Sequence, residues 1–146
     1  MENRPALILL IEDDETHAML TSRAFEDVEI KHEIRWICSG DEAMDYLFQK
    51  GKFADQKDSP RPDLILLDLR LPVVDGHEIL KAVKGSDDLK ALPVVILTTS
   101  QNKADMDRAY SNYANSYLVK PMGSDKFREM IDALGTYWLK WNQRIE

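Results

Sequence analysis

Polar residues with complementary chemistry follow directly after several short apolar segments of this chain. Glu12 and Asp13 follow the first such segment, and Asp68, Thr98 and Lys120 each end a later one. Carboxylates that crowd into one cleft repel each other unless a cation or protons relieve the repulsion. Because hard oxygen ligands without an accompanying His or Cys cluster suit Mg²⁺ better than Zn²⁺, we expect a Mg²⁺ site.

The same residues could carry out phosphoryl transfer. Mg²⁺ takes a few protein oxygens and leaves other positions for water and phosphate. Asp68 can attack as a carboxylate nucleophile and form an acyl phosphate. The ion and the Lys120 ammonium would neutralise phosphoryl oxygens, and the Thr98 hydroxyl would donate a hydrogen bond to another.

Each of these residues also has an ordinary structural explanation. An acid pair after a strand often begins a helix, where it interacts favourably with the helix dipole. A single Asp or Thr at a strand end is commonly a capping residue. The joint occurrence favours a functional site, because ligand sites of parallel sheets lie beyond the carboxyl ends of the strands.

Apolar runs of strand length alternate with amphipathic helical segments along the whole chain. The strands are expected at residues 6–11, 29–37, 63–68, 93–97 and 116–119. Strands that are apolar on both faces and alternate with helices predict an α/β fold with a doubly wound, five-stranded parallel sheet. Asp75 can cap the third helix. One face of the fourth helix is expected to carry Met106, Ala109, Tyr110 and Tyr113.

Composition restricts the class of protein. A length of 146 residues, with 44% hydrophobic and 31% charged residues, fits one globular domain at residues 1–146, with a core at about 6–138 and an extension at 139–146. The net charge of −7 argues against nucleic-acid or anionic-membrane partners. The single cysteine, Cys38, cannot form an internal disulfide, and no apolar run is long enough for a membrane span. We therefore expect a cytoplasmic location.

The strings LILLIEDD, DLILLDLRLPVVDG, VVILTTS and NSYLVKP resemble the signature segments of bacterial response-regulator receiver domains. The resemblance extends from about residue 7 to residue 138. It implies the flavodoxin-like strand order 2-1-3-4-5. It also implies a two-component phosphorelay, in which a sensor histidine kinase donates a phosphoryl group to Asp68. Such a domain is not a conventional enzyme, although it catalyses its own phosphorylation and dephosphorylation.

The resemblance assigns further roles residue by residue. The metal ligands would be Glu12, Asp13, Asp68 and the backbone carbonyl of Arg70, while Thr98 and Lys120 would contact the phosphoryl group. Tyr117 falls on the position of the aromatic switch residue. The resemblance also implies a cis bond between Lys120 and Pro121. The three histidines, in contrast, are expected on the surface: His17, His32 and His77.

A closer resemblance involves the regulators that partner cyanobacterial and bacterial phytochrome kinases. It is carried by the long polar loop at residues 51–62, the string LTTS and the aromatic string YWLKW near the end of the chain. Receivers commonly pair through the fourth helix, fifth strand and fifth helix. We expect a homodimer through this surface, extended by the tail residues Tyr137, Leu139 and Trp141.

Two alternatives remain open. A haloacid-dehalogenase-like phosphatase also uses Asp, Thr or Ser, Lys and Mg²⁺. Those enzymes place a general acid two residues after the nucleophile, whereas this chain has Arg70 there. A receiver-like adaptor that is never phosphorylated is disfavoured, because every residue that the chemistry requires is present.

Overall fold

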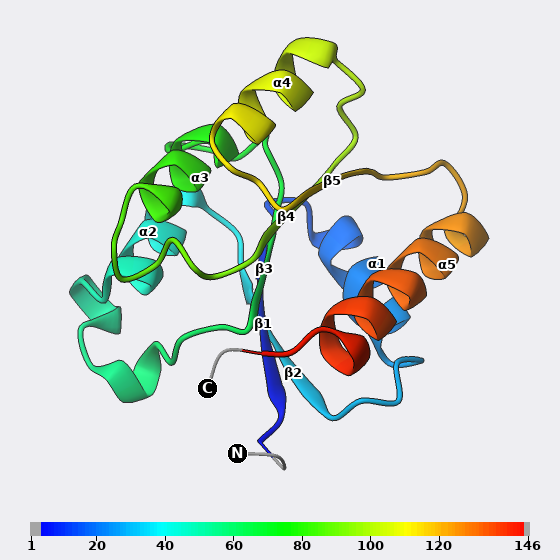
Figure 1. Cartoon of the computed structure of the whole chain (residues 1–146), viewed down its shortest axis with the longest axis horizontal. Coiled ribbons are helices and arrows are strands. Elements are labelled where there is room, and N and C mark those ends of the chain that lie inside the picture. Colours follow the sequence, from blue (N-terminus) through cyan, green and yellow to red (C-terminus); the bar gives the residue numbers. More distant parts are fainter. Residues whose placement is uncertain (1–3, 145–146) are drawn as a thin grey trace.

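A parallel sheet of five strands runs through the middle of the structure (Figure 1). This computed structural model describes residues 4–144, so residues 1–3 and 145–146 of the expected domain lie outside the described residues. The strands are β1 (Ala6–Ile11), β2 (His32–Ile37), β3 (Leu64–Leu67), β4 (Val94–Thr98) and β5 (Ser116–Val119). Their order is β2-β1-β3-β4-β5 with parallel pairing throughout, which confirms the predicted fold.

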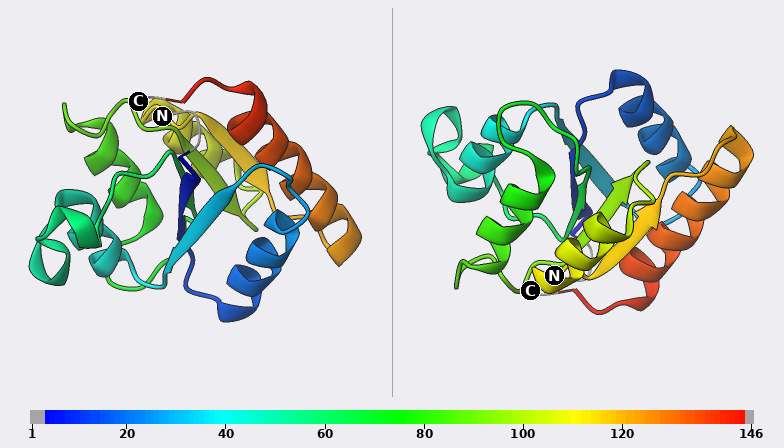
Figure 2. Two further views of the ribbon diagram at one scale, coloured as in Figure 1. Left: turned by 90° about the horizontal axis from the view of Figure 1, so that it is seen from below. Right: turned by 90° about the horizontal axis from the view of Figure 1, so that it is seen from above.

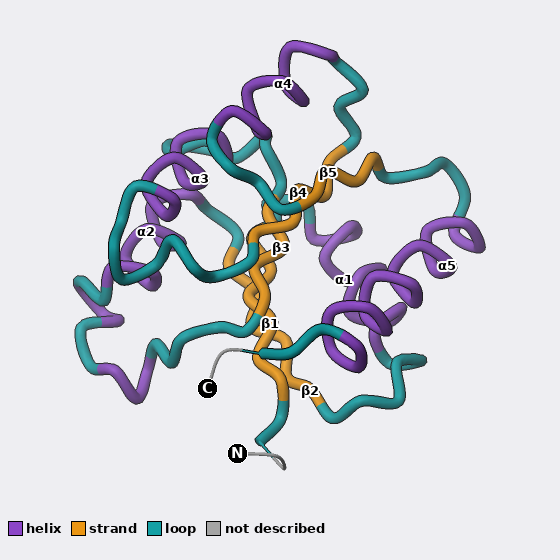
Figure 3. Tube along the Cα trace, viewed as in Figure 1, coloured by secondary structure: helices purple, strands orange, loops and turns teal. Residues whose placement is uncertain are grey.

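Helices cover both faces of the sheet (Figure 1, Figure 3). α1 (Glu15–Phe25) and α5 (Ser124–Gly135) lie on one face, and α2 (Gly40–Phe48), α3 (Gly76–Lys84) and α4 (Lys103–Ser111) lie on the other. The views along the sheet in Figure 2 show the strands fanned by their twist between these two layers. Within residues 4–144, none of the helices has the length and apolar character that a membrane span requires.

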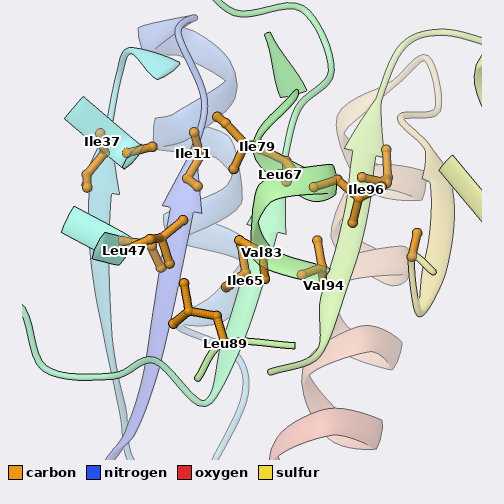
Figure 4. Packing of buried hydrophobic residues seen from close by; sticks show 14 of the residues in the cluster. Ile11, Ile37, Leu47, Ile65, Leu67, Ile79, Val83, Leu89, Val94 and Ile96 are labelled. Atoms are coloured by element: carbon orange, nitrogen blue, oxygen red, sulfur yellow. The ribbon is translucent and has the colours of Figure 1, made fainter. Parts of the chain in front are cut away.

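The central strands are buried on both faces because each face packs against helices. Side chains alternate along a strand, so Ile11 and Ile65 point toward α2 and α3 and contact the same cluster as Val83 (Figure 4). Ile8 and Leu64 point the opposite way, toward α1 and α5. Each such fully buried aliphatic side chain contributes about 1.5–3 kcal/mol to stability. This packing fixes the strand ends that carry the polar residues.

Local signals explain how α3 begins beside β3. The Asp75 carboxylate accepts a hydrogen bond of 3.0 Å from the Glu78 N–H, which confirms the predicted cap. The first helical residue is Gly76, and a Cβ atom there would overlap the carbonyl oxygen of Asp68. The start of α3 therefore approaches the end of β3 more closely than any residue with a side chain permits.

Two expected details of α4 and β2 are wrong. Only Ala109 is buried in α4, while Tyr110 and Tyr113 are 52% and 75% exposed. The helix ends at Ser111, and Tyr113 has a left-handed backbone with φ of 68°, so it cannot continue a helical face. β2 begins at His32 rather than at residue 29.

The chain continues beyond α5 into a π-helical segment, Thr136–Trp141. Leu139 is buried, and the partly buried Trp138 packs on the core between the sheet, α1 and α5. Tyr137 and Trp141 are 54% and 67% exposed, so the indole of Trp141 is not folded back onto the domain. The tail therefore has one side that stabilises the domain and one aromatic side that faces solvent.

Candidate functional site

The carboxyl ends of four strands bring the predicted polar residues to one edge of the sheet. The N–H of Glu12 donates to the Ile37 carbonyl at 3.0 Å, and that of Asp68 donates to the Ile11 carbonyl at 3.0 Å. These bonds continue the strand pairing by one residue beyond β1 and β3. The two acids are thus placed by the sheet itself rather than by a flexible loop.

Three carboxylates lie close enough to hold one metal ion. One oxygen of each of Glu12, Asp13 and Asp68 lies within 4.8 Å of the others. Glu12 and Asp68 are buried, whereas Asp13 is exposed and faces solvent. Such an all-oxygen set, open on one side, fits a hard divalent cation that keeps water ligands.

Lys120 supplies the positive charge of the site. Its Nζ donates to Glu12 Oε1 and lies 3.3 Å from Asp68 Oδ2, and the side chain is almost fully buried. Nζ also lies 3.0 Å from Nδ1 of His17, so this partly exposed histidine, which was expected on the surface, contacts the site. His17 lies in the first turn of α1, three positions after the N-cap Asp14, whose carboxylate accepts a hydrogen bond of 3.1 Å from the His17 N–H.

Burial changes the acidity of Glu12. Its pKa is raised to about 7, mainly because the carboxylate is removed from water. The hydrogen bond from Lys120 opposes this rise, and the charge of Asp68 adds to it. Glu12 is therefore a group for which protons and a metal ion compete near neutral pH.

Thr98 and Tyr117 are connected through the loop after β4. The fully buried Thr98 accepts a hydrogen bond of 3.3 Å from the Ser100 N–H at Oγ1. Tyr117 is partly buried, and its hydroxyl donates to the Ser100 carbonyl at 3.0 Å. The expected hydroxyl residue and the expected switch residue thus contact the same residue of this loop.

Arg70 lies beside Asp68 but its side chain points away. Its N–H donates to Asp68 Oδ1 at 3.3 Å, while its guanidinium contacts Asp105 of α4 at 2.6 Å. Asp105 also contacts His77, which is buried, so the expectation of a surface His77 is wrong. His77 is the second residue of α3 and shares the buried side of that helix with Leu80. Asp105 could not be found from the sequence, since its contacts depend on how α4 packs.

The bond between Lys120 and Pro121 is not cis. None of the peptide bonds within residues 4–144 is cis, which corrects the expectation from the resemblance. A trans bond is the intrinsically preferred form before proline. In this form the Lys120 N–H donates to the Thr98 carbonyl at 2.7 Å, and the ammonium still contacts both buried acids.

The arrangement matches a known family. Residues 8–132 match the response regulator receiver domain. The chain belongs to this family. A receiver domain is in general not a conventional enzyme but a signalling domain.

Relatives of this receiver are similar over nearly its whole length. The probable methanogenesis regulatory protein FilR2 of Methanothrix harundinacea is 45% identical over 139 residues, covering 95% of this chain and 87% of the relative. Response regulator Rcp1 of Synechocystis is 39% identical over 138 residues, covering 94% and 92%. Both are matched along most of their own length.

Two solved structures share the fold closely. The Mn²⁺-bound form of Rcp1 superposes with a TM-score of 0.91 at 37% identity, covering 97% of this chain and 100% of that one. The phosphorylated cyanobacterial phytochrome response regulator RcpA superposes with a TM-score of 0.92 at 34% identity, covering 98% and 100%. This receiver is therefore similar to phytochrome response regulators as well as to the family in general.

Proposed function

We propose that this receiver accepts a phosphoryl group on Asp68 from a sensor histidine kinase and signals by protein association. The observation that carries the proposal is the cluster in which Asp68 is grouped with the carboxylates of Glu12 and Asp13 and lies 3.3 Å from the Lys120 ammonium. An Asp68 oxygen would attack the phosphorus of a phosphohistidine. The P–N bond would break as the P–O bond forms, and the imidazole would leave.

The other residues would stabilise the transferred group. Lys120 would shift from its contacts with Glu12 and Asp68 to a phosphoryl oxygen, and the Thr98 hydroxyl would donate to another. Glu12, Asp13, Asp68 and the Arg70 carbonyl would hold the metal ion. When bound, this ion supplies positive charge against the phosphoryl oxygens.

We propose Mg²⁺ as the cofactor. The carboxylate set supports a hard divalent cation, and the relative Rcp1 has a Mn²⁺-bound structure. Mn²⁺ and Mg²⁺ both favour carboxylate and water ligands. A phytochrome-type kinase as the donor is supported by the similarity to RcpA, whose solved form is a phosphorylated phytochrome response regulator.

We also propose a two-fold symmetric homodimer through α4, β5, α5 and the tail. β5 is an edge strand with partly exposed residues. Exposed aromatic side chains lie at the end of α4 and in the tail: Tyr110, Tyr113, Tyr137 and Trp141. Exposed aromatic residues on a small domain are typical of interaction surfaces. The net charge of −7 disfavours nucleic acid and anionic membranes as partners.

The phosphatase alternative is less well supported. A general acid would have to reach the leaving group beside Asp68, but Arg70 occupies the position two residues later and pairs with Asp105. We expect no turnover of p-nitrophenyl phosphate. Sustained Asp68-dependent turnover would favour the phosphatase instead.

A transfer experiment tests the proposed function. Candidate kinases are autophosphorylated and mixed with the chain and Mg²⁺, and the products are separated on a Phos-tag gel. We expect the phosphoryl group to appear on the wild-type chain and not on Asp68→Asn. Labelling of Asp68→Asn at the wild-type level would contradict the assignment of Asp68.

A further inference from the structure

Asp105 of α4 connects three segments that surround the phosphoacceptor. Its Oδ2 accepts hydrogen bonds from the Arg70 guanidinium and from the Ser100 hydroxyl, both at 2.6 Å. Its Oδ1 lies 3.0 Å from Nε2 of His77. The Asp105 side chain is only 13% exposed, so these contacts replace most of its hydration. Arg70 and Ser100 lie two residues after Asp68 and Thr98, respectively.

The environment of His77 indicates which groups carry charge in this cluster. His77 is 1% exposed, and its Nδ1 has no hydrogen-bond partner among the described residues. A buried N–H without an acceptor is strongly unfavourable, so the proton belongs on Nε2, which donates to Asp105. The Ser100 hydroxyl and the His77 ring orient the Asp105 carboxylate. Arg70 is then the cation that pairs with it.

The position of Arg70 gives this ion pair a consequence for the phosphoryl group. The Arg70 N–H contacts Asp68 Oδ1 at 3.3 Å, so its side chain starts beside the phosphoacceptor. The Arg70 side chain is 64% exposed, and its guanidinium turns toward Asp105 of α4 instead. A phosphoryl group on Asp68 brings close to two negative charges, and guanidinium binds phosphate oxygens in a bidentate manner. Asp105 and the phosphoryl group therefore compete for Arg70.

We propose that Asp105 is a positioning residue that shortens the lifetime of the phosphoryl group by holding Arg70 away from it. This inference rests on the proposed phosphorylation of Asp68. In hydrolysis, a water oxygen attacks phosphorus and the bond to the Asp68 oxygen breaks, which releases inorganic phosphate and restores the carboxylate. While Arg70 is paired with Asp105, the phosphoryl group stays open to water. A released guanidinium would cover the phosphoryl oxygens and slow this attack.

A double-mutant cycle on the rate of phosphoryl loss tests the proposal. The full chain and its Asp105→Asn, Arg70→Ala and combined variants are labelled with acetyl phosphate and Mg²⁺, desalted, and followed by intact-mass spectrometry. We expect Asp105→Asn to slow the loss by about threefold or more, and this slowing to vanish when Arg70 is alanine. The matched control is Asp107→Asn, because Asp107 lies on the same helix and pairs only with the exposed Lys103 among the contacts described.

The possible outcomes separate the two proposals. Absence of labelling of wild type would contradict the proposed function itself. Normal labelling with an unchanged or faster loss in Asp105→Asn would overturn the role of Asp105, as would equal slowing in both Arg70 backgrounds. Slowing by Asp107→Asn to the same extent would also overturn it, since the effect would then follow the charge of α4. If Asp105→Asn is poorly folded, Asp105→Ser removes the same charge and takes its place in the cycle.

Discussion

The indole nitrogen of Trp36 donates a hydrogen bond of 2.6 Å to the backbone carbonyl of Glu12. Trp36 lies on the edge strand β2 and is 43% exposed, while Glu12 is buried at the candidate metal site. This hydrogen bond places a fluorescent side chain against the backbone of an expected metal ligand. The other two tryptophans, Trp138 and Trp141, lie in the C-terminal tail.

Binding of Mg²⁺ should therefore change the fluorescence of Trp36 in a saturable way. We expect Trp36→Phe to remove most of this response and Trp141→Phe to leave it intact. Asp13→Asn should weaken Mg²⁺ binding by about tenfold or more, because it removes one negative ligand. A full response in Trp36→Phe, or unchanged affinity in Asp13→Asn, would show that the ion binds elsewhere.

The affinity for Mg²⁺ should depend on pH through Glu12. The pKa of Glu12 in the folded protein is about 7, above the ordinary value of 4.5. Between pH 4.5 and pH 7 the folded protein therefore keeps a proton on Glu12 that the unfolded chain has released. In the metal-free protein this proton contributes stability that declines as pH rises through that window. Mg²⁺ must displace the proton, so affinity should be about tenfold weaker at pH 6 than at pH 8.

The matched variant for this titration is Glu12→Gln, which cannot ionise. We expect its Mg²⁺ affinity to be weaker at both pH values and to lose most of the pH dependence. Isothermal titration calorimetry at the two pH values provides the measurement. An equally steep pH dependence in Glu12→Gln would assign the titrating group to another residue.

Replacement of Gly76 tests how closely α3 must approach β3. A Cβ at Gly76 would overlap the Asp68 carbonyl, so Gly76→Ala should lower the free energy of unfolding by about 2 kcal/mol or more. The matched control is Gly85→Ala at the other end of α3, where the new Cβ would lie 3.1 Å from the Lys81 carbonyl oxygen. Urea denaturation should show a much smaller loss there, and equal losses would contradict the close approach.

The proposed homodimer depends on the exposed side of the tail. Tyr137→Ser and Trp141→Ser should weaken self-association in sedimentation experiments without unfolding the domain, because both side chains are more than half exposed. Point variants are preferable to truncation, since Leu139 and Trp138 pack on the core. The control is Met19→Ser, which changes an exposed apolar residue of α1, outside the proposed surface. A wild-type chain that stays monomeric at high micromolar concentration, with and without acetyl phosphate, would exclude the dimer.

The sequence predicted those parts of the site that the sheet determines. Glu12, Asp68 and Lys120 follow apolar strands, and parallel strands place their carboxyl ends at one edge. The contacts of His77 and Asp105 could not be predicted, because they depend on how two helices pack on the sheet and on each other. Periodicity, which is a local property, cannot specify that packing.

The predicted face of α4 extended beyond the end of the helix. The spacing of Ala109 and Tyr113 fits a helix, but the helix ends at Ser111 before Tyr113 is reached. End points depend on capping and on left-handed turns that several residue types can form. Predicted helical faces are therefore least dependable near the last turn.

The central claim is that Asp68 is the phosphorylated residue, and chemical mapping tests it most directly. The chain is labelled with acetyl phosphate and Mg²⁺, reduced with borohydride, digested and sequenced by mass spectrometry. Reduction converts an aspartyl phosphate into homoserine, so the modified residue is identified by its position. We predict homoserine at position 68 and unmodified Glu12, Asp13 and Asp14. Reduction at one of those acids, or an unmodified Asp68 in a chain that has taken up phosphate, would contradict the account.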